Sequence, residues 1–301
     1  MTDEFFPDWD RNTRLPSPTP PEGSCDCQFH IFHDDIAKYP AKPNAYYQPS
    51  KGAGFGEAQG MLRALGFSRG VIVHAMPYDT DHSLLIDTLE SIGEAERKNI
   101  RATGIIKDDV SDATLTCLDS LGVRGARFNV GKKYAEETPL ASVKKSIDRA
   151  RELGWHAKLH ITGEDILDFA DFLLSITDIT IVVDHMAHLH LEEGLEQPAC
   201  RWLLDRLNTN ENWWMMMSNG NRDSKMEVGF DDAVPFGRKF LEAAPDRMVW
   251  GSDWPHVLWR KTRVMNDAET VELLYRYADH DAELIRKVLV DNPVKLYGFV
   301  D

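Results

Sequence analysis

The sequence of 301 residues contains only four cysteines, and no two of them form a CxxC pair. Four is too few for a disulfide-rich secreted scaffold, and the missing CxxC spacing argues against a structural zinc site. We therefore expect these four side chains to be reduced thiols: Cys25, Cys27, Cys117 and Cys200.

An excess of positive charge is also missing. The formal net charge is −15, and the chain has no Lys/Arg-rich run. Such a molecule repels nucleic acid and anionic membrane surfaces, so we expect neither as a partner. A homo-oligomer is compatible with the sequence, which does not determine the oligomeric state.

No long apolar run opens the chain. Residues 1–23, "MTDEFFPDWDRNTRLPSPTPPEG", are acidic and rich in proline, without a cationic start followed by an apolar stretch. They resemble neither a signal peptide nor a membrane anchor, which predicts a cytoplasmic location. Because proline prevents a regular helix, we expect an extended arm that lies against the body or a neighbouring subunit.

What the sequence does contain is typical of a globular α/β protein. Hydrophobic residues make up 43% and charged residues 28%, which suffices for a sizeable core. Short β-type runs alternate with helical patterns such as 139–154, the signature of repeated βα units. We predict a single-domain (β/α)8 TIM barrel over residues 24–301. Its eight strands are expected to begin near residues 25, 70, 102, 123, 155, 180, 213 and 248.

Polar residues stand at the ends of several predicted strands. The fifth strand ends in His160, the sixth in His185, and the eighth in Asp253 followed by His256. A single histidine there is more often structural than functional. In a barrel, however, the carboxyl ends of all strands face one mouth, so these side chains are expected to converge on a site.

The first strand carries Gln28 and His30 where metal-dependent hydrolases on such barrels carry two histidines. An amide is a poorer ligand than imidazole for a transition metal, so we favour a metal-free site in which Gln28 bonds a substrate oxygen. No cofactor is expected. A divalent metal remains an alternative, with four candidate ligands: His30, His160, His185 and Asp253.

Several segments together resemble the amidohydrolase superfamily: "DCQFH", "HAKLH", "VVDHMA", "MVWGSDWPH" and "DNPVKLYGF". The resemblance spans about residues 24–300 and is greatest to the branch of lactonases and lactone isomerases, which includes enzymes of 2-pyrone-4,6-dicarboxylate and D-galactarolactone. It implies a barrel that often works without a metal. It also implies that Asp253 is a general base and that His30 and His185, beside His160, polarise a lactone carbonyl.

Arginines near two strand ends suit an acidic substrate. Arg124 and Arg127 lie in "GVRGARFNVGKK" and Arg222 lies in "SNGNRDS", and a guanidinium binds a carboxylate with two hydrogen bonds. Four further residues are candidates for substrate contact: Tyr47, His74, His188 and His256. The resemblance would place an arginine at position 188, so substrate recognition is expected to differ there.

Lys158 has the inward parity of His160, and a buried ammonium needs a partner, for which Asp26 is a candidate. We expect hydrolysis of a small anionic lactone, with Asp253 activating water. One alternative is an intramolecular lactone isomerase that uses the same site. Others are a metal-dependent decarboxylase or hydratase on the same barrel, and a binding protein without activity, against which the retained Asp253 argues.

Overall fold

Eight parallel strands form one sheet in the order of the sequence, as predicted. The computed structural model describes residues 9–134, 139–259 and 261–300. Each strand pairs with the next along the chain, and helices lie between them, which confirms the (β/α)8 barrel. The strands are β1 (Cys25–Phe29), β2 (Arg69–Val73), β3 (Ile100–Gly104), β4 (Val123–Asn129), β5 (His156–His160), β6 (Ile181–Val183), β7 (Trp213–Met217) and β8 (Met248–Trp250).

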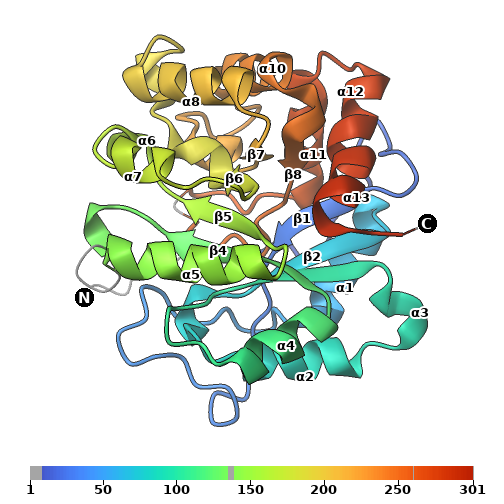
Figure 1. Cartoon of the computed structure of the whole chain (residues 1–301). Coiled ribbons are helices and arrows are strands. Elements are labelled where there is room, and N and C mark those ends of the chain that lie inside the picture. The colour runs from blue at the N-terminus through green and yellow to red at the C-terminus, as the bar shows by residue number, and fades with distance from the viewer. Residues whose placement is uncertain (1–8, 135–138, 260, 301) are drawn as a thin grey trace.

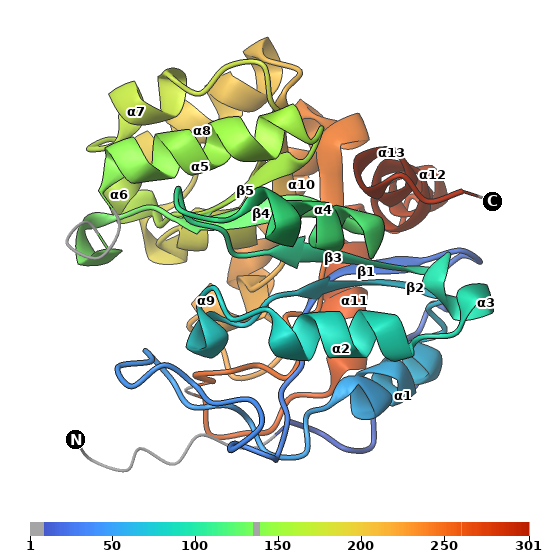
Figure 2. The ribbon, with the colours of Figure 1, turned by 60° about the horizontal axis from the view of Figure 1, so that its bottom comes forward.

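Helices surround these strands, as Figure 1 shows. In Figure 2, α1 and α2 lie on one side of β1–β3, while α5 and α8 lie on the other side, beyond β4 and β5. The α-helices are α1 (Phe55–Leu65), α2 (Ser83–Ser91), α3 (Glu94–Arg97), α4 (Asp112–Ser120), α5 (Leu140–Glu152), α6 (Gly163–Ile166), α7 (Ala170–Leu174), α8 (Pro198–Thr209), α9 (Gly220–Asp223), α10 (Val234–Ala243), α11 (Asp267–Tyr277), α12 (Ala282–Arg286) and α13 (Asn292–Tyr297).

Helix α5 illustrates why the helices could be predicted from the spacing of apolar residues. Its buried residues Val143, Ile147 and Ala150 recur every three to four positions and so form one apolar stripe against the sheet. The helix ends just before Gly154, whose φ of +70° is a conformation that glycine adopts without strain.

The interior of the barrel is apolar at the amino-terminal end. Val71, Val182, Met216 and Val249 form a cluster there with Cys25, Cys27 and Trp214, closed by Tyr297 of α13. The pairing of β1 with β2 shifts register between Asp26 and Phe29. A strict alternation along β1 would place Asp26, Gln28 and His30 on one face, and the register shift interrupts that alternation.

The barrel closes between β8 and β1 through residues that follow β8. The Asp253 amide donates to the Gln28 carbonyl at 2.9 Å, and the His30 amide donates to the Trp254 carbonyl at 2.8 Å. Gly251 allows this approach, because a Cβ there would lie 2.6 Å from the Gln28 Cβ. The closure therefore sets Asp253 beside Gln28 and His30.

Residues 9–23 form neither helix nor strand and run against the barrel. Trp9 packs edge-on against Trp254 with ring centroids 4.9 Å apart, and Thr13 donates to Asp267 of α11. The remainder of the predicted arm, residues 1–8, lies outside the described residues. Within the described part of the chain, no helix has the length and apolar character needed to cross a membrane.

Candidate active site

A pocket of about 370 Å³ lies where the carboxyl ends of the strands converge. Its wall includes residues from β4 and β5 and from the loops that follow β1, β6, β7 and β8. Eight of the residues singled out from the sequence line it: His30, Tyr47, Arg127, His160, His185, His188, Arg222 and Asp253.

A left-handed turn after β6 brings two of the histidines to the pocket. His185, Met186, Ala187 and His188 all have positive φ, between 45° and 58°. Non-glycine residues rarely adopt this conformation in succession, because each costs about 1–2 kcal/mol. Asp253 and Asn219 also have a positive φ. Such backbone strain concentrates at functional sites, where the surrounding packing maintains it.

Asp253 is surrounded by donors. Asn219 Nδ2 lies 3.0 Å and Arg222 Nη2 3.3 Å from its Oδ2, while Gln28 Nε2 lies 3.2 Å from its Oδ1. Burial alone would raise the pKa of the Asp253 carboxyl. His185, the contact from His30 and the Arg222 guanidinium outweigh this effect and hold that pKa well below its usual range. The carboxylate is thus ionised and oriented at the floor of the pocket.

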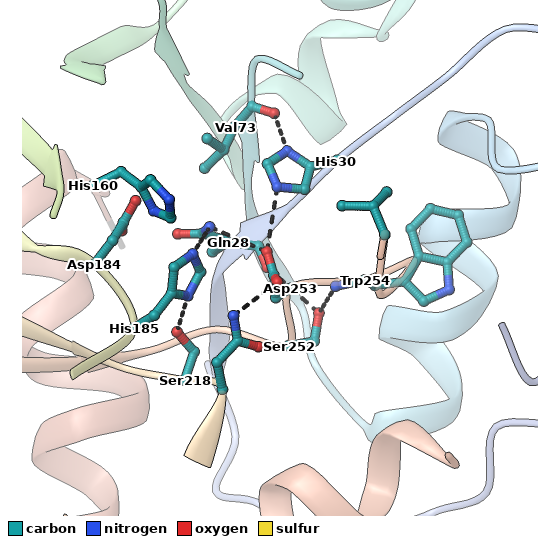
Figure 3. Close-up of polar contacts among 12 residues, drawn as sticks. Gln28, His30, Val73, His160, Asp184, His185, Ser218, Ser252, Asp253 and Trp254 are labelled. Carbon is teal, nitrogen blue, oxygen red and sulfur yellow. Dashed lines mark hydrogen bonds and ion pairs between the residues drawn. The ribbon is translucent and has the colours of Figure 1, made fainter. Parts of the chain in front are cut away.

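Gln28 connects Asp253 to His185, as Figure 3 shows. Because a carboxylate only accepts, the Gln28 amide nitrogen is the atom that faces Asp253, and its second hydrogen points to His185 Nε2 at 3.1 Å. The side chain is completely buried and does not line the pocket. In this structure the Gln28 amide nitrogen is used beneath the pocket floor, and the expected contact between Gln28 and substrate stays a prediction.

Both ring nitrogens of His30 face oxygen atoms. Nδ1 lies 2.8 Å from the Val73 carbonyl, and Nε2 lies 3.3 Å from Asp253 Oδ1. Both nitrogens are thus directed at protein oxygens. His30 lines the pocket and is a partner of Asp253 in this structure. The hydrogen bond from His30 to a lactone carbonyl stays a prediction.

His185 also lacks a free donor. Its Nε2 accepts from Gln28, and its Nδ1 lies 2.8 Å from Ser218 Oγ. Burial lowers the pKa of His185, so the ring is neutral. The expected hydrogen bond from His185 to a carbonyl does not fit these contacts.

His160 has the opposite arrangement. Arg127 Nη2 lies 3.2 Å from His160 Nδ1, and a guanidinium can only donate. Burial and the Arg127 charge lower the pKa of His160 well below its usual value, so the ring is neutral. A neutral ring that accepts at Nδ1 carries its proton on Nε2. His160 thus supplies an N–H donor in the pocket lining.

One group of side chains in the described residues has the spacing of a metal site. His160, His185 and His188 each offer a nitrogen within 4.8 Å of the others. This set differs from the predicted ligands, since His30 and Asp253 belong to the hydrogen-bond network at the floor.

The donor chemistry of this group does not fit a divalent cation. A ligating imidazole needs a bare nitrogen and usually donates its other N–H to a carboxylate or carbonyl. His188 meets this condition, because its Nδ1 lies 2.9 Å from Asp223 Oδ1. His160 instead faces the Arg127 cation, and His185 Nε2 receives the Gln28 amide.

Besides Gln28, three predicted contact residues lie outside the pocket: Arg124, His74 and His256. Arg124 and Arg127 are three positions apart, so they point to opposite faces of β4 and are about 10 Å apart along it. Arg124 Nη1 donates to the Asp119 carbonyl at 2.9 Å. His74 is buried against His82 behind the wall, and burial lowers its pKa to about 3. His256 Nε2 contacts Asp267 Oδ1 at 2.8 Å, which links the loop after β8 to α11.

Four further residues of the pocket were not predicted as site residues from the sequence. Asn219 and Tyr134 line the pocket with the cationic side chains of Lys133 and Lys261. Lys133 belongs to the segment "GVRGARFNVGKK" that contains Arg127. Asn219 follows the end of β7 by two positions, and this position after a strand could have identified it. Lys261 lies in a long loop after β8, where no local pattern predicts its position.

A family model described as amidohydrolase matches residues 25–299. The chain is 31% identical to a 2-pyrone-4,6-dicarboxylate hydrolase of Comamonas testosteroni, over 96% of this chain and 95% of the relative. It is 32% identical to a 4-sulfomuconolactone hydrolase of Hydrogenophaga intermedia, with 93% and 90% covered.

A D-galactarolactone isomerase of Agrobacterium fabrum is 26% identical, with 94% of this chain and 93% of the relative covered. Among solved structures, a putative 2-pyrone-4,6-dicarboxylic acid hydrolase from Pseudomonas putida superposes with a TM-score of 0.77 at 29% identity. That match covers 92% of this chain and 98% of the other.

Proposed function

The chain belongs to the amidohydrolase family, and we propose that it hydrolyses a small lactone that bears a carboxylate, without a metal ion. Relatives named as hydrolases of a pyrone dicarboxylate and of a sulfomuconolactone support this substrate class. The single observation that carries the proposal is the oriented Asp253 carboxylate, with its lowered pKa, in a pocket whose lining also includes cationic side chains and histidines.

The cationic side chains of the pocket bind the acidic group of the substrate. Arg127, Arg222 and Lys133 line it, and charge-assisted hydrogen bonds to a carboxylate are about twice as strong as neutral ones. The net charge of −15 excludes long-range attraction of an anion, so recognition is short-range.

Asp253 acts as the general base in this proposal. It takes a proton from a water molecule as that water attacks the lactone carbonyl, and it returns the proton to the ring oxygen as the acyl–oxygen bond breaks. The products are a hydroxyl and a carboxylic acid, and the acid then releases its proton to solvent to become a second carboxylate, so the atoms and charges balance.

His160 stabilises the oxyanion that forms on the carbonyl. Its Nε2–H is a donor already held in place, and such a donor is effective because it needs no reorganisation when charge develops. In this proposal His160 takes the role that the sequence predicted for His30 and His185, whose ring nitrogens are directed at protein groups.

A screen of lactones tests the proposal. Pyrone carboxylates, acidic sugar lactones and their uncharged counterparts would be incubated with the purified protein, and products identified by NMR. We expect ring opening of acidic lactones at full rate after exhaustive chelation. Turnover that is lost on chelation and restored by zinc or manganese would contradict metal independence. Failure with every acidic lactone would contradict the proposed substrate class.

An intramolecular lactone isomerase is the second candidate. The relative named as a galactarolactone isomerase favours it, and the chemistry differs only in that a substrate hydroxyl replaces water. Product analysis separates the two, because hydrolysis incorporates oxygen from ¹⁸O-labelled water and isomerisation does not. The same screen distinguishes both from a decarboxylase or hydratase, and turnover of any substrate excludes a pure binding protein.

A further inference from the structure

Lys158 lies beneath the pocket and is not one of the residues that line it. It belongs to β5, two positions before His160, and its side chain is completely buried. Its Nζ lies 2.7 Å from Asp184 Oδ1, and Asp184 is also completely buried. The partner is thus Asp184 and not Asp26, whose Oδ1 accepts from the backbone amides of Gln28 and Ser252.

Asp184 uses its two oxygens for two different cations. Oδ1 faces Lys158, while Oδ2 accepts from Arg127 Nε at 2.9 Å. Arg127 then reaches His160 through Nη2 at 3.2 Å, and Nη1 makes neither of these bonds. Figure 3 shows Asp184 next to the ring of His160. A continuous series of contacts therefore runs from Lys158 through Asp184 and Arg127 to His160.

The division of Asp184 between two cations has a geometric consequence. A guanidinium that meets a free carboxylate normally pairs with both oxygens, through two parallel hydrogen bonds. Lys158 occupies one oxygen, so Arg127 binds the other through Nε alone and Nη2 is left to reach His160. Without the ammonium, Asp184 can accept two bonds from Arg127, which draws Nη2 away from the ring.

We propose that Lys158 and Asp184 are positioning residues, which hold Arg127 so that it fixes His160 as the Nε2–H tautomer and presents Nη1 to the pocket. The effect of this arrangement on turnover rests on the function proposed above. The tautomer itself is a property of the ligand-free protein, so it can be measured whether or not a substrate is known.

The first test compares wild type with Lys158→Met, which is close in length and carries no charge. Histidine-¹⁵N-labelled protein would be studied by long-range ¹H–¹⁵N correlation, with the His160 signals assigned from a His160→Gln variant. We expect Nε2–H in wild type and a loss of that preference in Lys158→Met. The same tautomer in both proteins, or Nδ1–H in wild type, would overturn the proposal.

Measuring the unfolding free energy of Lys158→Met distinguishes a positioning role of Lys158 from a purely structural one. Removing one partner of a buried ion pair is destabilising, because the other charge remains buried. Asp184 keeps its hydrogen bond from Arg127 Nε when Lys158 is changed to Met, so we expect the variant to stay folded with a lower unfolding free energy. Removal of groups that orient a functional residue typically costs tenfold to a hundredfold in activity, and we expect about this loss in kcat/KM. A loss of activity that only follows a loss of folded protein would contradict the proposal.

A double-mutant cycle tests whether Lys158 affects activity through Arg127. If Lys158 acts through Arg127, Lys158→Met should slow the wild-type enzyme but cause little further loss in Arg127→Ala. Independent, additive losses would overturn the proposal. His156→Leu is the matched control, because His156 is buried on the same strand two positions before Lys158 and contacts Tyr297 and not Arg127. We expect it to leave the His160 tautomer unchanged.

If wild type turns over no acidic lactone, the function proposal fails while the NMR comparison still decides the positioning proposal. If acidic lactones are hydrolysed but Lys158→Met keeps both the tautomer and the rate, only the positioning proposal fails.

Discussion

At the scale of single residues, the role of each site residue depends on whether one of its hydrogen-bonding atoms is still free to contact a ligand. The side-chain nitrogens of Gln28, His30 and His185 are directed at protein groups: at one another, Asp253, the Val73 carbonyl and Ser218. His160 retains an N–H because Arg127 occupies its other nitrogen. Histidines that look equivalent in the sequence thus have different roles in the structure.

Asp253→Asn should lose about two to four powers of ten in kcat, because an amide cannot accept the proton from water. Folding should be retained, since the backbone bond between residue 253 and Gln28 does not involve the side chain. The measurement is kcat on the lactone found in the screen, with circular dichroism as the control. A loss of less than tenfold would remove Asp253 from the role of base.

Arg222→Gln should shift the acidic limb of the pH–rate profile to higher pH. Arg222 lowers the pKa of Asp253, so its removal raises that pKa. The base is active only when ionised, and activity is lost as pH falls through the pKa. The profile should be recorded as kcat/KM with an uncharged lactone, which has no carboxylate for Arg222 to bind. An unchanged limb would show that the contact does not tune the base.

At the scale of elements, the β8–β1 closure determines where Asp253 lies. Strands β1 to β8 pair in order by ordinary ladders, whereas the closing hydrogen bonds come from residues after β8. The left-handed turn at residues 185–188 has a similar function after β6, because it aims two histidines at one pocket.

Gly251→Ala should destabilise the protein by about 1–3 kcal/mol and reduce activity, because the added methyl overlaps Gln28 and separates the closing strands. Gly60→Ala is the matched control. Gly60 lies inside α1 with nothing within 4 Å of an added Cβ, so the same change there should stabilise by about 0.5–1 kcal/mol. Urea denaturation measures both, and equal effects at the two sites would contradict the closure argument.

At the scale of the whole molecule, the buried charges make stability depend on pH. Burial raises the pKa of Asp26 to about 7, whereas in the unfolded chain it is about 3.9. Between these values the folded protein binds a proton that the unfolded chain does not. The contribution of Asp26 to stability is therefore present at low pH and lost as pH rises through about 7.

Asp26→Asn removes this titration. We expect the unfolding free energy of the variant, relative to wild type, to rise as pH increases from about 4 to about 7, the window between the two pKa values. Urea denaturation at a series of pH values measures the unfolding free energies of both proteins. The contributions of the other titrating groups cancel when the two values are subtracted. A difference that does not change with pH would mean that Asp26 has an ordinary pKa.

The sequence by itself determined the barrel and much of the pocket lining. The alternation of β-type runs and amphipathic helices depends on local periodicity, and the position of Asp253 or His160 after a strand is enough to place it at the mouth. Arg124 was misplaced because two arginines of one segment were treated as neighbours, although an odd spacing on a strand separates them.

Only the tertiary structure decided how the site residues pair. Lys158 was given Asp26 as a candidate partner, but the fold brings it to Asp184, which follows a neighbouring strand. The donors on Asp253 come from β1, the loop after β7 and α9, and no local pattern relates these segments. The periodicity of helices and strands depends on interactions between residues that are close in the sequence, so the sequence alone reveals it. The proton position on His160 depends on its contact with Arg127, which exists only once β4 and β5 are paired in the barrel.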